Sequence, residues 1–179
     1  MKWTQDEIFE ACKIVAPKFN LNPVVVLAFA KQEAKKDGKY FLADVAKPEP
    51  RFYTTYIVPM NLSTSTEVLL AASYGVFQSM GQVLRELGFF DADFANQSSE
   101  YQSRYISSMS QENVPKAIDR FCVDLQYQVE YACIKIRKLI DKYGSDMRKV
   151  ALMYNGGGRP EYADEWGANL KQAQAECKL

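Results

Sequence analysis

The chain has 179 residues, with 22 basic and 22 acidic side chains and no histidine. This length suits one domain with its own core, and the balanced charge argues against a nucleic-acid partner. Without histidine, the sequence excludes a Ser-His-Asp triad and any histidine-ligated zinc or iron site, so acid–base chemistry near neutral pH falls to a carboxyl, Lys, Tyr or Cys with a shifted pKa.

Two predicted helices begin the chain. Thr4 and Glu7 form a capping-box pattern that starts the first helix. Its buried face is marked by Ile8, Cys12 and Val15. Asn22-Pro23 is typical of a helix start, and residues 24–34 are apolar on nearly all sides, which predicts a buried central helix. Asp37-Gly38 should end it.

The next segment, residues 39–62, is rich in proline and aromatic residues, and it predicts irregular structure with one short helix around 51–56. Thr64 and Glu67 form a second capping-box pattern, which opens a helix that continues through Ala72. Ser73-Tyr74-Gly75 should break this helix.

Four further helices are expected, at 82–87, 113–144, 146–153 and 161–175. The longest begins at Asn113-Val114-Pro115 and ends at Gly144. Its buried face is marked by Ile118, Cys122, Leu125, Val129, Ile136 and Ile140. Gly88 should end the helix at 82–87, and Ser145 should cap the helix at 146–153. Residues 91–112 are polar and predict one short helix with loops, and the glycines that follow Asn155 predict a turn.

The four cysteines lie at positions 12, 122, 133 and 177 and form no C-x-x-C pair, so no zinc knuckle is expected. Two disulfides and four free thiols both remain open. The first residues lack the apolar run of a signal peptide, and the apolar run 23–30 is too short to span a bilayer. We therefore expect synthesis in the cytoplasm and no membrane insertion.

Glu33 is the strongest candidate for acid–base chemistry. On a helix it shares a face with the apolar residues Val26, Phe29 and Ala30. Burial on such a face raises the pKa of a carboxyl, and so does a position in the last turn of a helix, where the dipole disfavours negative charge. A raised pKa is what a general acid needs. The alternative is a structural salt bridge between Glu33 and Lys36.

Five segments resemble motifs of the soluble lytic transglycosylases and goose-type lysozymes, in the same order and at similar spacing. They are residues 28–33 around Glu33, 49–53, 73–80, 83–89 and 151–157. The segment 73–80 resembles the family's Gly-Leu-Met-Gln core, and 151–157 resembles its Ala-x-x-x-Tyr-Asn-x-Gly motif. The resemblance covers residues 20 to 170. It departs from the family at Ala34, where a serine usually follows the catalytic glutamate.

The resemblance implies an all-α, lysozyme-like single domain over residues 1–179, acting without metal or organic cofactor. Glu33 would protonate the glycosidic bond between N-acetylmuramic acid and N-acetylglucosamine. In a lytic transglycosylase it would then act as base on the muramoyl C6 hydroxyl and close a 1,6-anhydro ring. A muramidase that hydrolyses the bond would need a second carboxylate, for which Glu49 and Glu67 are the candidates. The alternative role of Glu67 is the capping box with Thr64. The alternative role of Glu49 is an ion pair with Arg51.

The substrate-binding residues that the resemblance implies are Glu49, Tyr53, Glu67, Ser73, Gly75, Gln78, Met80, Tyr154 and Asn155. Gly75 would let the backbone approach a sugar, and Gln78 would bond an N-acetyl group or ring hydroxyl. Tyr154 would hold Glu33 through its hydroxyl, or simply pack in the core. Asn155 suits a turn as well as a substrate contact, and Met80 suits either a binding surface or the core.

The partner that the resemblance implies is the glycan strand of peptidoglycan, at the bacterial cell wall. A phage-encoded product is expected, either an endolysin or a virion component in contact with other virion proteins. A non-catalytic structural or binding module of the same fold is the rival hypothesis, and Ala34 favours it.

Overall fold

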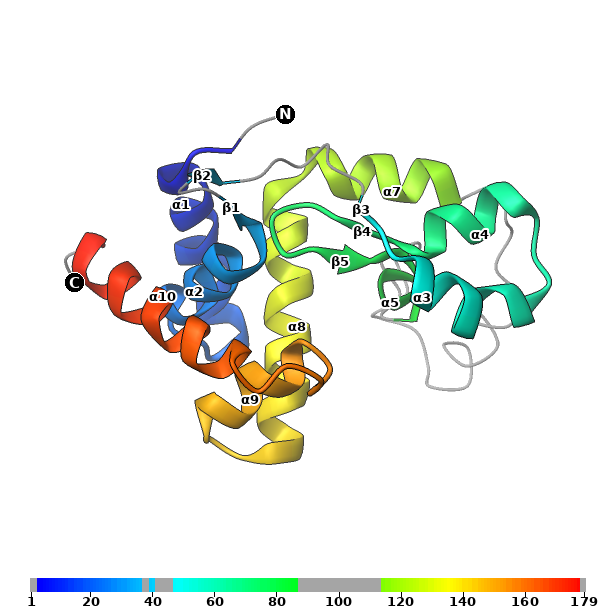
Figure 1. Ribbon diagram of the computed structural model, residues 1–179. Helices are drawn as coiled ribbons and strands as arrows, with labels where there is room; N and C mark the ends of the chain where they lie inside the picture. The colour runs from blue at the N-terminus through cyan, green and yellow to red at the C-terminus, as the bar shows by residue number, and fades with distance from the viewer. Residues whose placement is uncertain (1–2, 37–38, 41–46, 87–113, 178–179) are drawn as a thin grey trace.

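The computed structural model describes residues 3–36, 39–40, 47–86 and 114–177. Helices dominate these residues, which confirms the expected mostly helical class (Figure 1). The helical elements are α1 Gln5–Val15, η1 Ala16–Phe19, α2 Pro23–Ala34, α3 Pro50–Phe52, η2 Tyr53–Ile57, η3 Val58–Met60, α4 Thr64–Leu70, α5 Gly81–Glu86, α7 Val114–Val123, α8 Leu125–Tyr143, α9 Met147–Tyr154 and α10 Tyr162–Glu176. The strands are β1 Lys35–Lys36, β2 Lys39–Tyr40, β3 Lys47–Pro48, β4 Ala72–Tyr74 and β5 Ser79–Met80.

Helix α2 is the centre of the larger group of helices. It packs against α1, α8 and α10, and Figure 1 shows these helices together with α9 on one side of the molecule. Most of its residues from Val24 to Ala30 are apolar and buried, as is Ala34, and the charged Lys31 is also buried. The rings of Phe29 in α2 and Trp166 in α10 lie 5.2 Å apart. The expected buried central helix is therefore confirmed.

The first two helices begin where the sequence predicts. The amide of Glu7 donates to Thr4 Oγ1 at 3.2 Å, and the Glu7 carboxylate accepts from the amide of Thr4 at 2.7 Å. At the start of α2, the amide of Val24 donates to Asn22 Oδ1 at 2.8 Å. Each bond satisfies an amide that has no partner inside the helix.

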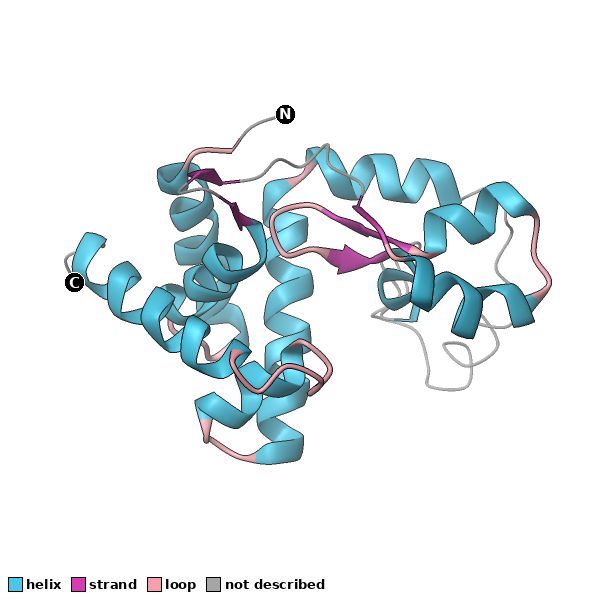
Figure 2. Cartoon of the chain, viewed as in Figure 1, coloured by secondary structure: helices cyan, strands magenta, loops and turns pink. Residues whose placement is uncertain are grey.

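The shorter helices α3, η2, η3, α4, α5 and α7 lie on the other side of the molecule, around a small sheet (Figures 1 and 2). Strands β3, β4 and β5 form this antiparallel sheet, in which Ser73 lies opposite Lys47 on one side and Met80 on the other. The sequence predicted a helix through Ala72 followed by a break, and it did not reveal the sheet. Strands of two or three residues are too short to show alternating hydrophobicity.

The expected long helix over 113–144 is wrong, because the structure divides it into α7 and α8 at Asp124. Asp124 has an extended backbone, and its carboxylate accepts from the amide of Tyr127 at 3.0 Å, so it caps α8. The apolar spacing continues across the break, and for this reason it did not reveal the break. The expected face is buried at Ile118, Leu125, Val129 and Ile136 and half-buried at Cys122 and Ile140.

Two predicted caps are shifted by one residue. Ser63, not Thr64, is the N-cap of α4, so the capping box of Thr64 with Glu67 does not form. Asp146, not Ser145, caps α9, through the amides of the next turn at 3.1 and 3.2 Å. An aspartate carboxylate is a charged acceptor and makes the stronger bond at a helix start.

The proline-rich middle is more regular than expected. Helical turns of α3, η2 and η3 follow one another from Pro50 to Met60. The expected helices at 82–87, 146–153 and 161–175 agree with α5, α9 and α10 within about two residues. The expected stops at Asp37-Gly38 and Gly88 and the polar segment 91–112 lie outside the described residues.

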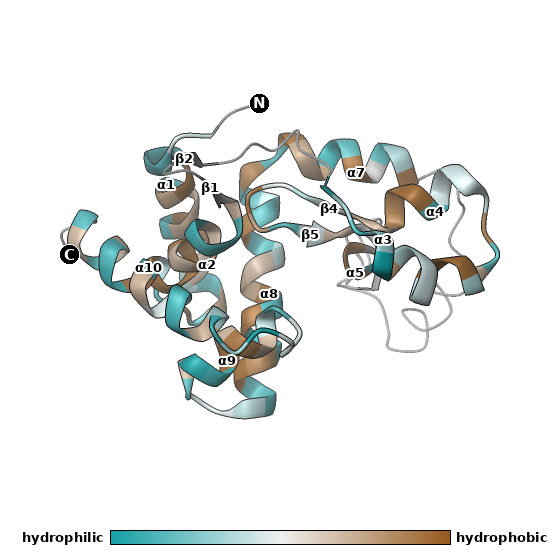
Figure 3. Ribbon diagram, in the orientation of Figure 1, coloured by the Kyte–Doolittle hydropathy of each residue, from teal (hydrophilic) through white to brown (hydrophobic). Residues whose placement is uncertain are grey.

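Figure 3 shows apolar residues concentrated where α8 and α9 meet and along α4, and polar residues on the outward turns. Within the described part of the chain, no helix has both the length and the apolar composition that crossing a membrane requires.

Candidate active site around Glu33

Glu33 lies in the last turn of α2, one residue before Ala34. Its side chain is half-buried, and Val26, Phe29 and Ala30 on the same helix are fully buried. Burial raises the pKa of the Glu33 carboxyl, because the surroundings disfavour its charged form. This direction agrees with the expectation from the sequence. The Lys36 side chain, the alternative partner of Glu33, is outside the part that the structure describes.

Tyr162 holds the Glu33 carboxyl. It is the first residue of α10, and its hydroxyl donates a hydrogen bond to Glu33 Oε1 at 2.5 Å. This bond favours the carboxylate form and therefore partly offsets the effect of burial on the pKa of Glu33. Burial and the neighbouring Glu33 charge raise the pKa of Tyr162, so the phenol stays protonated as a donor.

Tyr154 was expected either to make this bond or to pack in the core, and the structure shows the core packing. Tyr154 is buried at the end of α9, with its ring 4.5 Å from that of Phe29. Its hydroxyl has no hydrogen-bonding partner among the described residues. Burial is the largest cause of the raised pKa of Tyr154, and the charges of Tyr131 and Glu33 also raise it. Tyr154 belongs to the site as a ring in its wall, whereas Tyr162 makes the hydrogen bond.

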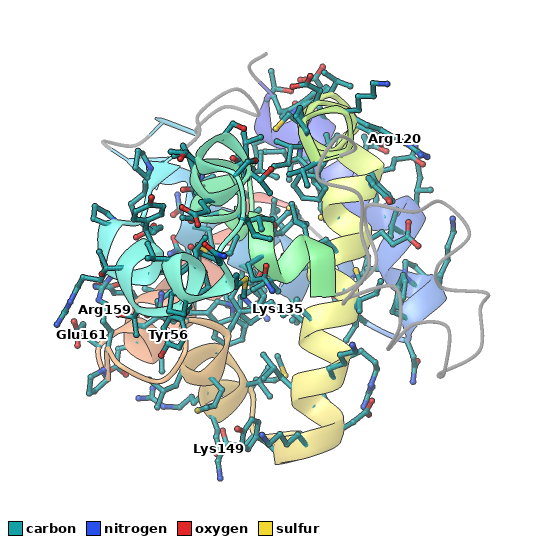
Figure 4. All side chains as sticks on the ribbon, turned by 90° about the vertical axis from the view of Figure 1, so that its right-hand side faces the viewer. Tyr56, Arg120, Lys135, Lys149, Arg159 and Glu161 are labelled. Carbon is teal, nitrogen blue, oxygen red and sulfur yellow. The ribbon has the colours of Figure 1, made fainter. Side chains whose placement is uncertain are left out.

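Lys135 is a member of the site that the sequence analysis missed. It extends from α8 toward the middle of the molecule (Figure 4), and its Nζ lies 3.8 Å from the centroid of the Tyr154 ring. Burial lowers the pKa of Lys135 to about 8, and the Glu33 charge opposes this change. A signal was present in the sequence, because Lys135 follows the buried Gln128 and Ala132 at helical spacing.

Two more cations act on Glu33 from other elements. Lys47 in β3 and Arg159 in the turn before α10 both lower the pKa of Glu33. Each has its own carboxylate partner, since Lys47 Nζ lies 2.7 Å from Glu49 and Arg159 lies 3.2 Å from Glu165. Figure 4 shows Arg159 at the edge of the molecule. Lys47 thus links the charge of Glu49 in the sheet region to that of Glu33.

The sheet brings together three of the predicted binding residues, Glu49, Ser73 and Met80. Ser73 Oγ lies 3.2 Å from Glu49 Oε1 and 3.1 Å from Met80 Sδ. Its single proton bonds one acceptor at a time, and the carboxylate is the stronger acceptor. Glu49 is ion-paired with Lys47 instead of the expected Arg51.

Tyr53 and Glu67 form a separate pair. The Tyr53 hydroxyl donates to Glu67 Oε2 at 3.1 Å, and this bond raises the pKa of Tyr53. Glu67 is buried, with 8% of its surface exposed. Glu67 thus bonds a tyrosine in place of the predicted capping box.

Gly75 and Gln78 lie in the turn between β4 and β5. Gly75 has a φ of +69°, and a Cβ there would lie 2.3 Å from Gln128 Oε1, so the close approach at Gly75 is made by a side chain of α8. Gln78 Nε2 donates to the Gly75 carbonyl at 3.0 Å and closes the turn. The predicted sugar contacts of both residues stay predictions.

The remaining predicted positions are Asn155 and Ala34. Asn155 is exposed and caps the end of α9, followed by Gly156 and Gly157 with positive φ, as expected of a turn. Ala34 is 1% exposed and packs in the core, so the family's usual serine position faces inward here.

Among the described residues, no three His, Cys, Asp or Glu side chains are grouped so that they hold a metal ion. All four cysteines are free thiols, of which Cys12 and Cys133 are buried.

Comparisons with models of protein families, with curated proteins and with solved structures give no match for this chain.

Proposed function

We propose that this protein is a lysozyme-like lytic transglycosylase that cleaves peptidoglycan glycan strands, with Glu33 as its single acid/base. The observation that carries the proposal is the state of the Glu33 carboxyl. It is half-buried, burial raises its pKa, and a hydrogen bond from Tyr162 holds it in place. A carboxyl in such surroundings keeps its proton closer to neutral pH and donates it to a leaving oxygen. The order of motifs along the chain supports the choice of substrate.

The hydrogen bond also assigns the two oxygens of Glu33. Oε1 accepts from Tyr162, so in the protonated acid the proton resides on Oε2. Oε2 would protonate the glycosidic oxygen between N-acetylmuramic acid and N-acetylglucosamine, and that bond would break. The resulting carboxylate would take the proton of the muramoyl C6 hydroxyl, whose oxygen bonds C1 and closes the anhydro ring.

A hydrolase of the same fold is the second candidate, and the position of Glu49 favours it. Glu49 is ion-paired with Lys47, whose charge also acts on Glu33, so Glu49 is the candidate carboxylate that shares a cation with Glu33. Such a carboxylate activates water in inverting enzymes.

The cell wall is the place of action that this chemistry requires. An endolysin and a virion component that opens the wall during infection both fit, and a virion component would also contact other phage proteins. The rival is a non-catalytic module, which the buried Ala34 in place of a serine favours.

The test is the release of soluble fragments from purified peptidoglycan by wild type, Glu33→Gln and Glu10→Gln. Gln keeps the shape of the side chain but cannot donate an acidic proton, so Glu33→Gln should lose about 10²- to 10⁴-fold in rate. Glu10→Gln, at an exposed position paired with Lys13, should match wild type. Equal rates for wild type and Glu33→Gln would remove Glu33 from the mechanism.

A further inference from the structure

Lys135 occupies an unusual position for a lysine. It lies on α8 among buried residues, and its ammonium sits 3.8 Å from the centroid of the Tyr154 ring. The Tyr131 ring, one turn earlier on the same helix, is 5.9 Å from the same ammonium. Two aromatic faces thus fix the direction of a long side chain that is normally mobile.

The charge of Lys135 has little compensation. No ion pair of Lys135 with a described carboxylate falls within salt-bridge distance, although its charge and that of Glu33 act on each other. Removing an ammonium from water is costly when no partner offsets it. A methionine of similar length would fill the same space without this cost. The burial of Lys135 therefore indicates that its positive charge acts on a neighbouring group.

The groups that face Glu33 come from several elements. Tyr162 on α10 bonds the carboxyl, Tyr154 on α9 lies near it, and Arg159 and Lys47 act from the turn before α10 and from β3. Arg159 and Lys47 are each neutralised in part by another carboxylate. The ammonium of Lys135 lies over the Tyr154 ring, and that ring lies 4.5 Å from the ring of Phe29, one turn before Glu33 on α2. Among the described residues, no salt bridge joins Lys135 to a carboxylate.

We propose that Lys135 is a positioning residue whose ammonium group, held over the Tyr154 ring, stabilises the carboxylate form of Glu33. The catalytic importance of this effect rests on the proposed function, because the carboxylate is the form that Glu33 takes after it has donated its proton. Burial alone would keep Glu33 protonated to higher pH, and it would disfavour the carboxylate that remains after the proton is donated. Lys135 favours the anion, so that the same group serves next as a base.

The test is a ¹³C NMR titration of the Glu33 side-chain carboxyl, which the spectrum of Glu33→Gln assigns. Lys135→Met removes the charge and should raise the Glu33 midpoint by about one pH unit. Lys135→Arg keeps the charge and should restore the midpoint toward that of wild type. Lys138→Met, on the exposed side of the same helix, is the control and should leave the midpoint unchanged.

A midpoint of Glu33 that does not move in Lys135→Met would overturn the proposal. If Lys135→Met does not fold, Lys135→Gln gives the same comparison with a polar side chain. A purely structural Lys135 would change the thermal stability of the variants and leave the Glu33 midpoint in place.

The activity profile separates this proposal from the proposed function. In an active protein, the high-pH limb of kcat/KM reports the acid form of Glu33, and it should shift upward with the NMR midpoint in Lys135→Met. A wild type that releases no glycan fragments contradicts the proposed function, whereas the titration still decides the role of Lys135.

Discussion

Glu33 is governed by a balance of opposing effects. Burial raises the pKa of its carboxyl, whereas the Tyr162 hydrogen bond and the cations Lys135, Lys47 and Arg159 lower it. Burial is the largest effect, so the carboxyl retains its proton to higher pH than an exposed glutamate. The cations limit this increase, which suits the proposed mechanism, in which the same group would give up and recover a proton within one turnover.

Tyr162→Phe removes only the hydroxyl that bonds Glu33, so it tests how far this bond lowers the pKa of Glu33. The change removes the bond to Glu33 Oε1, so the pKa of Glu33 should rise and the high-pH limb of kcat/KM should move upward. The loss of orientation should also lower the rate about tenfold or more, the scale of a hydrogen bond to a charged group. Glycan release measured between pH 4 and 9 gives both values. Tyr143→Phe, which removes a hydroxyl at the end of α8, is the control, and identical profiles for Tyr162→Phe and wild type would contradict the account.

The sequence could predict Glu33 but not all of its neighbours. A carboxylate among apolar residues on one helix is a local pattern, visible within a few positions. The choice between Tyr154 and Tyr162 depends on how α9 and α10 pack against α2, which is a contact over more than 120 positions. Lys135 had a local signal, but a lysine at helical spacing from buried residues is more commonly exposed at its end.

The turn between β4 and β5 is a junction between the sheet and α8. Gln128 of α8 accepts from the amide of Val76 at 2.9 Å and donates to the Phe121 carbonyl at 3.0 Å. Both partners and Gln128 are buried, so these bonds satisfy polar groups that water does not reach. Gly75 leaves the space that the Gln128 amide fills.

Gly75→Ala should therefore be destabilising by about 2–5 kcal/mol, from a positive φ together with overpacking against Gln128. Gly156→Ala, also at a positive φ but with open space around it, should cost only about 1–2 kcal/mol, because no overpacking adds to the backbone strain. Urea unfolding of the two variants measures both. Equal losses would mean that the contact with Gln128 contributes nothing.

At the level of elements, local patterns predicted where helices begin, although the caps of α4 and α9 lie one residue away from Thr64 and Ser145, and the features that depend on distant contacts were missed. Thr4 with Glu7 and Asn22 with Pro23 act within one helical turn, and both starts were predicted. The break at Asp124 was missed because apolar spacing continues through it, and the sheet was missed because its short strands depend on partners far along the chain.

The molecule as a whole is divided between a group of helices around α2 and a second group around the sheet, with α8 between them (Figure 1). Glu33 belongs to the first group and Glu49 to the second. A glycan strand that contacts both carboxylates would therefore contact both parts of the molecule.

The four cysteines offer a test of the packing across the whole molecule. Cys12 and Cys133 are buried, and burial raises the pKa of both thiols, that of Cys133 to about 12. A thiol reagent such as Ellman's should therefore reach Cys122 and Cys177 in the native protein and all four after unfolding in urea without reductant. Fast reaction of all four native thiols would contradict the packing, and fewer than four after unfolding would indicate a disulfide.

In the proposed mechanism, Glu33 cleaves glycan strands without adding water. Mass spectrometry of fragments released in ¹⁸O-labelled water, by wild type and by Glu33→Gln, tests it most directly. We predict 1,6-anhydromuramoyl ends without ¹⁸O from wild type and no such release from Glu33→Gln. Reducing ends that carry ¹⁸O would contradict the transglycosylase and favour a hydrolase with Glu49, and no release by folded wild type would contradict the enzyme altogether.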